Sequence, residues 1–372
     1  MSINPDHVYA LCTSVSYKKG KAGELIFLQP SLSVATIFQC DDSVSLFLNL
    51  LRDKKRTIRD LCNELDVVDK ESKEKFFVMV RLLEQNHIIE NRTWLEDEMN
   101  KHFNSYLASR YESSIDFFSS YENNRLSRYE MQQQLLQARV LLLGVGGIGS
   151  AVFDGLLRCG VRHMTIVDHD IVDEKNLTHQ AIYNKGDIGS PKVIAAVRYA
   201  RQIDPEVQIQ AMQMKIDRNF KFKNLLNSIN LVLICCDEPS VEFLCDIISP
   251  YCFSAKVPFI VGGGYSHHSG GMPRTIIPDN SVCWDCHKKY LSKFHQESSE
   301  EFLHIAPGGG VIGPLSGIIA NLVTLESIKL LSKFSTPSFI NYIGEFNVAN
   351  AVILSEQVLA DKNCPNCQNG EM

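Results

Sequence analysis

Residues 141–160 read LLLGVGGIGSAVFDGLLRCG, three leucines followed by a glycine-dense corner and an apolar run of helical character. Gly144, Gly146 and Gly149 form the pattern G-x-G-x-x-G, with Gly147 and Ile148 inside it. Where such a pattern joins a strand to a helix, backbone N–H groups and the helix N-terminus face a phosphate at close range. We therefore predict that these five residues bind a nucleotide.

Strand-like and helix-like runs alternate on both sides of this corner. The strand-like runs are RVLLLG (139–144), HMTIVD (163–168), VQIQAMQM (207–214), LVLICCD (231–237) and PFIVGG (258–263). This order predicts an α/β domain of Rossmann-like type, with a mostly parallel sheet and crossover helices. Asp168 ends the second run, where an acidic side chain can hold ribose hydroxyls. These features alone fit an NAD-dependent dehydrogenase equally well.

Composition narrows the class of protein. Charged residues make up 22% of the 372 residues and the net charge is −6, so no overall basic character points to nucleic acid or an anionic membrane as a partner. No signal segment precedes the twelve cysteines, which predicts a cytoplasmic protein with reduced thiols. Residues 305–325 are long enough to span a bilayer, but their first half is rich in glycine and proline and favours a turn into a buried helix.

The most specific pattern in the sequence is a pattern of metal ligands. It consists of two C-x-x-C pairs, Cys283 with Cys286 and Cys364 with Cys367. They are the ligand set of a closed, tetrahedral zinc site, which is structural because four thiolates leave no position for water. The long gap between the pairs predicts that zinc fastens the C-terminal tail onto the domain. A redox disulfide is an alternative for one pair, and His287 is expected to be a bystander.

The stretch VDHDIVDEKNLTHQAIYNKGDIGSPKV (167–193) resembles the segment after the glycine motif in E1-like adenylating enzymes, the ThiF/MoeB superfamily, which activate carboxylates with ATP. The resemblance implies ATP and Mg²⁺ as cofactors. It places Asp168 on the ribose, with Asp170 as the second acid of an Asp-x-Asp pair. It directs three residues to the triphosphate: Asn176, Gln180 and the catalytic Lys192. His179 stands where the family has Arg and lacks the permanent, bidentate charge of that residue.

Further stretches extend the resemblance to residues 121–367. ENNRLSRYE (122–130) is similar to an R-x-x-R helix whose arginine reaches the nucleotide across a homodimer interface, which implies a catalytic Arg128 with Arg125 as its helper. Solvated helix arginines are the alternative. Asp237 is implied to hold Mg²⁺ near the transferred phosphate. The stretch 308–331 implies a long helix behind the active site.

The first hundred residues indicate which class of substrate the protein acts on. Residues 1–95 mix short β-like runs with helical ones in a winged-helix-like order, 96–137 suit a polar linker ending in the arginine helix, and 138–372 form the adenylation domain. This added unit is similar to the peptide-modifying branch, typified by the microcin C7 adenylating enzyme and pantocin-type enzymes. There it clamps a leader peptide as an extra strand. The alternative is a DNA-binding winged helix with the basic turn RDKKR (52–56).

The resulting expectation is ATP-dependent adenylation of a carboxylate on a short gene-encoded precursor peptide, an early step towards a peptide antibiotic, with cyclisation as one outcome. Residues 287–306 contain no cysteine, so a covalent thioester relay is not expected. Their His295, Glu300, Glu301 and His304 are taken as a solvated loop. Two alternatives remain: a MoeB/ThiF-type activator of a ubiquitin-like sulfur carrier, and a binding protein whose nucleotide site His179 has disabled.

Overall fold

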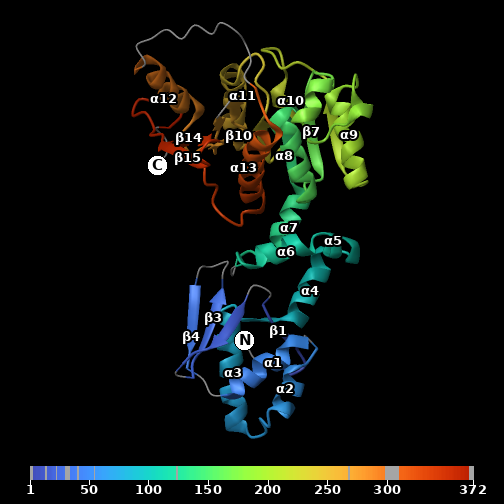
Figure 1. Cartoon of the computed structure of the whole chain (residues 1–372), viewed down its shortest axis with the longest axis vertical. Coiled ribbons are helices and arrows are strands. Elements are labelled where there is room, and N and C mark those ends of the chain that lie inside the picture. Colours follow the sequence, from blue (N-terminus) through green and yellow to red (C-terminus); the bar gives the residue numbers. More distant parts are fainter. Residues whose placement is uncertain are drawn as a thin grey trace. The chain divides into compact units, whose positions relative to one another are not determined.

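The computed structural model describes residues 3–12, 15–21, 23–29, 34–39, 42–53, 55–122, 125–266, 269–297 and 310–367. The chain divides into two compact units, Met1–Glu130 and Met131–Met372. Figure 1 colours the first from blue to teal and the second from green to red. The expected Glu300, Glu301 and His304 lie outside the described residues.

The N-terminal unit combines a three-stranded antiparallel sheet, ordered β2-β3-β4, with a short antiparallel ladder of β1 and β5. Its strands are β1 (Tyr9–Leu11), β2 (Ser16–Lys19), β3 (Leu25–Gln29), β4 (Val34–Phe38) and β5 (Ile89–Asn91). Its first helices are α1 (Asp42–Leu50), η2 (Leu51–Asp53), α2 (Ile58–Glu64) and α3 (Lys70–Gln85). Thr57 and Asp60 form a capping box that fixes where α2 begins. This arrangement agrees with the expected winged-helix-like unit.

Most of residues 96–119, expected as part of a polar linker, are helical. They form α4 (Arg92–His102), α5 (Ser105–Arg110) and α6 (Glu112–Ser119). Asn91 and Asn104 accept hydrogen bonds from the first turns of α4 and α5, and Tyr111, Ile115 and Phe118 are buried. The caps and these few apolar contacts outweigh the polar composition of the segment. Helix α7 (Arg128–Gln137) follows.

A six-stranded sheet ordered β13-β10-β9-β6-β7-β8 forms the centre of the second unit. Its strands are β6 (Arg139–Leu143), β7 (His163–Val167), β8 (Gln208–Met212), β9 (Leu231–Ile234), β10 (Phe259–Val261) and β13 (Arg274–Ile276). All neighbours pair in parallel except β10 and β13. The predicted Rossmann-like sheet is therefore confirmed. Its order reverses between β6 and β9, which places a ligand crevice at their carboxyl ends.

Helices connect and cover this sheet. They are α8 (Gly147–Arg158), η3 (Glu174–Thr178), η4 (Lys185–Asp187), α9 (Lys192–Ile203), α10 (Phe222–Leu226), α11 (Val241–Ala255), α12 (Trp284–Glu297) and α13 (Gly313–Ser332). The implied long helix is α13, which packs along α8 (Figure 1). Its length and composition would suit a membrane span, yet 56% of its most apolar window is buried inside the fold. Such burial is typical of a core helix.

A second, four-stranded antiparallel sheet was not predicted from the sequence. Its order is β11-β12-β14-β15. The strands are β11 (Gly264–Ser266), β12 (Ser269–Gly271), β14 (Tyr342–Asn347) and β15 (Val352–Gln357). Because β11 follows directly from the end of β10, this sheet supplies one wall of the crevice.

Candidate nucleotide site and metal centre

The glycine corner is built so that only its pocket side is open. Gly144 has φ +87°, and a methyl group added there would lie 2.7 Å from the Cys236 Cβ. A methyl group on Gly149 would lie 2.0 Å from the Gly144 carbonyl oxygen, so α8 rests directly on the turn. A methyl group on Gly146 would meet nothing within 4 Å. The corner thus leaves its backbone accessible to a ligand at Gly146.

A cleft of about 290 Å³ opens at this corner, at the carboxyl ends of β6, β7 and β9. It brings together most of the predicted site residues. Its predicted lining residues are Gly144, Gly146, Gly147, Ile148, Asp168, Asp170, Gln180, Lys192 and Asp237. A polar cleft at the topological switch point is where doubly wound sheets bind nucleotides.

Asp168 is fixed beside the corner by two backbone hydrogen bonds. Its Oδ2 accepts from the Val145 N–H at 2.8 Å, and its Oδ1 accepts from the Asp170 N–H at 2.8 Å. Each carboxylate oxygen keeps a further acceptor site. The geometry suits a carboxylate that accepts from two ribose hydroxyls.

Lys192 begins α9 and is only 5% exposed. Its Nζ lies 2.8 Å from Asp170 Oδ2, and its backbone N–H donates to the Asp170 carbonyl. Burial acts to raise the pKa of Asp170, but the bond to Lys192 and its positive charge hold that pKa below its ordinary value. Asp170 therefore stays ionised at neutral pH, and its bond to Lys192 holds the lysine side chain at the cleft wall.

The residues of the 176–180 segment differ in where they point. Asn176 is buried, and its Oδ1 accepts from the Asp173 N–H at 2.9 Å, so it caps η3 and does not line the cleft. Gln180 lines the cleft and is 6% exposed, and its Oε1 has no hydrogen-bond partner in the described part of the chain. A buried, unpaired oxygen is costly, so a ligand or bound water that donates to it would be stabilising.

His179 lies at the edge of the corner, where a methyl group on Gly147 would approach its Cδ2 to 3.3 Å. Its Nδ1 is 2.9 Å from the Thr178 hydroxyl. Burial, and then the positive charge of Lys192, lower the pKa of His179. The imidazole is therefore neutral at pH 7, unlike the arginine of the family motif.

Asp237 follows β9, is exposed and faces the cleft. Across the cleft, Asp168, His169 and Asp170 each offer a ligand atom, and these atoms lie within 4.8 Å of one another. Carboxylate oxygens are the ligands that Mg²⁺ prefers. The cleft therefore offers acids that could hold a cation beside a triphosphate.

The two arginines of the R-x-x-R motif lie in the N-terminal unit. Arg128 is 7% exposed and forms ion pairs with Glu122 at 2.7 Å and Glu90 at 3.1 Å. Arg125 is exposed. These ion pairs hold Arg128 within its own unit. That Arg128 contacts a nucleotide across a dimer interface stays a prediction.

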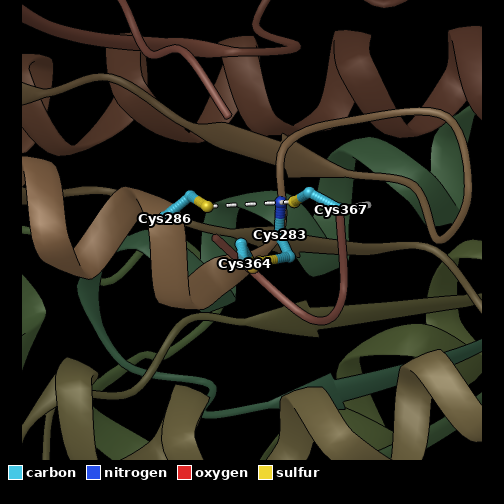
Figure 2. A group of neighbouring side chains, drawn as sticks. All are labelled: Cys283, Cys286, Cys364 and Cys367. Atoms are coloured by element: carbon cyan, nitrogen blue, oxygen red, sulfur yellow. Dashed lines mark hydrogen bonds between the residues drawn. The ribbon is translucent and has the colours of Figure 1, made fainter. Parts of the chain in front are cut away.

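The four cysteines of the C-x-x-C pairs converge on one buried point, as Figure 2 shows. Cys283 Sγ lies 3.4 Å from Cys364 Sγ, and Cys286 Sγ lies 3.8 Å from Cys367 Sγ. Four sulfurs around zinc at ~2.3 Å would be separated by ~3.8 Å. The cluster therefore fits a tetrahedral metal ion and joins the C-terminal tail to the start of α12.

The surroundings of these sulfurs also suit a cation. The Cys283 and Asp361 N–H groups donate to the sulfurs of Cys367 and Cys286. Burial raises the pKa of Cys286 to about 11, so this thiol would stay protonated at neutral pH without a positive ion beside it. His287 is buried but is not part of the cluster, in agreement with the expected bystander.

One wall of the cleft was not predicted from the sequence. Gly263, Gly264 and Tyr265 line it from the turn into β11. The only signal was the glycine run after the strand-like stretch 258–263. No motif marked Tyr265.

Together, the doubly wound sheet, the glycine corner and the acid at the end of β7 define a nucleotide-binding enzyme domain. The model of the ThiF family matches residues 120–369, and the chain belongs to this family. Molybdopterin-synthase adenylyltransferase from Salmonella typhimurium is 31% identical over 210 residues, covering 56% of this chain and 79% of the relative. The chain is accordingly an ATP-dependent adenylyltransferase, and the E1-like assignment is confirmed.

Two solved structures share its fold over nearly the full length. Escherichia coli MccB, solved with AMPCPP and MccA, has a TM-score of 0.70 at 19% identity and covers 97% of this chain and 99% of its own. PaaA has a TM-score of 0.73 at 17% identity, covering 93% and 98%. The similarity to both reaches beyond the ThiF domain into the N-terminal unit.

Proposed function

We propose that this adenylyltransferase activates a carboxylate of a short, gene-encoded precursor peptide. A carboxylate oxygen attacks the α-phosphorus of ATP, a new O–P bond forms, and pyrophosphate leaves with the electrons of the broken bond. The product is an acyl-adenylate. A nearby amide or amine of the peptide can then displace AMP, since proximity alone makes such a cyclisation fast.

The strongest support for this proposal comes from the N-terminal unit. The ThiF match begins at residue 120, whereas the likeness to MccB covers 97% of the chain. The fold shared with MccB therefore includes the residues expected to bind peptide. MccB is the neighbour that was solved together with MccA.

A groove in this unit suits an extended peptide. It has a volume of about 550 Å³ and is lined by residues of β3, β4, α1 and α3. Apolar side chains dominate the wall: Phe27, Phe38, Val44, Phe47, Phe76, Val78, Met79 and Leu82. Strand β4 is an edge of its sheet, so its outer backbone groups are available to an added strand. We infer that the leader pairs with β4 and places apolar side chains in the groove.

The cleft residues supply the chemistry of adenylation. Negative charge grows on the phosphate oxygens as the carboxylate attacks, and the Lys192 ammonium and the N-terminus of α8 stabilise it. We assign Mg²⁺ to Asp237, where it would neutralise charge on the phosphates. We assign zinc to the four-cysteine cluster, with a structural role.

We also propose that the enzyme is a homodimer in which Arg128 approaches the partner's nucleotide. Arg128 would first have to leave Glu90 and Glu122, because both carboxylates bind its guanidinium in the single chain. The alternative, a structural arginine that joins β5 to α7, predicts that Arg128→Lys weakens folding but not nucleotide binding.

A second candidate function is activation of a sulfur-carrier protein. The sequence comparison favours it, because the Salmonella adenylyltransferase is 31% identical over 210 residues of this chain. An assay of pyrophosphate exchange into ATP distinguishes the two candidate functions. A peptide should stimulate exchange in the first, and a carrier protein ending in Gly-Gly in the second.

The peptide proposal is tested by a pair of groove variants. Val78 is 52% exposed in α3 and lines the groove, whereas Val68 is 74% exposed and does not. Labelled peptides from reading frames beside the gene are titrated against the parent, Val78→Asp and Val68→Asp. We expect only Val78→Asp to lose affinity. Equal affinity of all three, or tight, salt-sensitive binding of duplex DNA, would contradict the leader assignment.

A further inference from the structure

Tyr265 occupies a place at the glycine corner that no motif explains. A methyl group on Gly147 would lie 2.1 Å from the Tyr265 hydroxyl oxygen, so the hydroxyl rests directly against the start of α8. A side chain at position 147 would displace this hydroxyl from its place. Tyr265 itself comes from β11, on the opposite wall of the cleft.

The surroundings of this hydroxyl favour a neutral hydrogen-bond donor. Tyr265 is half-buried, and its Oη forms no hydrogen bond among the described residues. Burial, with a contribution from the Asp237 carboxylate, raises the pKa of Tyr265, so the proton stays on the oxygen at neutral pH. The donor thus lies at the helix N-terminus, in the cleft that Asp237 also lines.

This position coincides with the place where the reacting phosphate must lie. The open backbone at Gly146 and the N-terminus of α8 bind a phosphate. Asp168, which suits the ribose, is tied to Val145 in the same turn. A nucleotide whose ribose meets Asp168 therefore places its α-phosphate, the phosphate closest to the ribose, beside the corner.

We propose that Tyr265 is a further catalytic residue, whose hydroxyl donates a hydrogen bond to a non-bridging oxygen of the α-phosphate. As the carboxylate oxygen bonds to phosphorus and pyrophosphate departs, this oxygen gains negative charge, and the bond strengthens. Tyr265 keeps its proton throughout. Its donor complements the uncharged His179 at the same corner, where the family motif has an arginine.

The competing role is obstruction, in which Tyr265 fills the phosphate position until ATP displaces it. The two roles predict opposite effects of removing the hydroxyl. A donor strengthens binding of any ligand that carries the α-phosphate. An obstructing side chain weakens it.

Calorimetric titration of the full-length enzyme with adenosine, AMP and MgATP separates them. These probes make the result independent of the proposed peptide. A hydrogen bond to a charged group contributes about 1.5–3 kcal/mol, so Tyr265→Phe should weaken AMP and MgATP at least ~10-fold while adenosine binds as before. Tyr265→His, which keeps a ring donor, should recover part of the loss. Tyr251→Phe, an exposed tyrosine that does not line the cleft, is the matched control.

Unchanged or tighter AMP binding by Tyr265→Phe would overturn the proposal and favour obstruction. An equal loss for adenosine and AMP would also overturn it, because the hydroxyl would then not act through the phosphate. With any peptide substrate in hand, the same variant should lower kcat by ~100-fold.

Discussion

Alanine substitutions at two positions of the glycine corner, Gly149 and Gly146, should both lower nucleotide affinity but should differ in how much they destabilise the fold. Gly149→Ala puts a methyl group 2.0 Å from the Gly144 carbonyl oxygen, a backbone atom that can move only if α8 moves. Overpacking of this kind costs about 1–3 kcal/mol, and the helix propensity of alanine returns about 1 kcal/mol at most. Because the clash is with backbone, we expect the upper end, a net loss of about 2 kcal/mol. Nucleotide affinity should fall with it.

Gly146→Ala meets nothing within 4 Å, so it should cost about 1 kcal/mol or less, the usual penalty for alanine in place of glycine at a helix N-cap. Its methyl group points into the cleft, and MgATP affinity should fall at least ~10-fold.

The assay combines urea unfolding with MgATP titration. The chain has two tryptophans, and a Trp94→Phe background leaves Trp284 to report on the second unit alone. Parent-like stability of Gly149→Ala would refute the packing described for the corner. Parent-like MgATP affinity of a folded Gly146→Ala would refute the phosphate position.

Three further outcomes are expected. Cys364→Ser should lose the metal and lower the melting temperature, since a structural zinc contributes folding energy; elemental analysis that finds zinc retained in the variant, or absent from the parent, would contradict this. Asp237→Ala should abolish pyrophosphate release while the protein remains folded, and unchanged release would remove its assignment to Mg²⁺. MgATP should bind more tightly as pH falls through the lowered pKa of His179, because the anionic ligand favours the protonated ring. His179→Gln should abolish this dependence, and a dependence that persists in the variant would assign it to another group.

Local sequence patterns predicted the site correctly where one short segment determines both the backbone conformation and the residues that bind a ligand. The corner at 144–149 and Asp168 follow strands of the parallel sheet, and Lys192 begins a helix that connects two of its strands, so all three meet at one cleft. The cysteine pairs converge because the C-x-x-C spacing is a ligand pattern in itself.

The sequence did not predict which contacts several of the site residues make. The R-x-x-R motif marks Arg128, but no motif marks its partner Glu90, which lies 38 residues away in the chain. Asn176 looks like a phosphate ligand in the sequence, but in the structure it caps η3. Tyr265 reaches the corner only because β11 and α8 face each other across the cleft. A local capping bond holds Asn176, whereas contacts between segments distant in the chain hold Arg128 and Tyr265.

We propose that a gene-encoded peptide, bound by the N-terminal unit, is adenylated in the ThiF-type cleft. The most direct measurement is exchange of labelled pyrophosphate into ATP with the candidate precursor peptide, the same peptide without its leader, and a carrier protein ending in Gly-Gly. We expect that only the full peptide stimulates exchange and that Val78→Asp, but not Val68→Asp, removes the stimulation. Stimulation by the carrier protein but not by the peptide would contradict it.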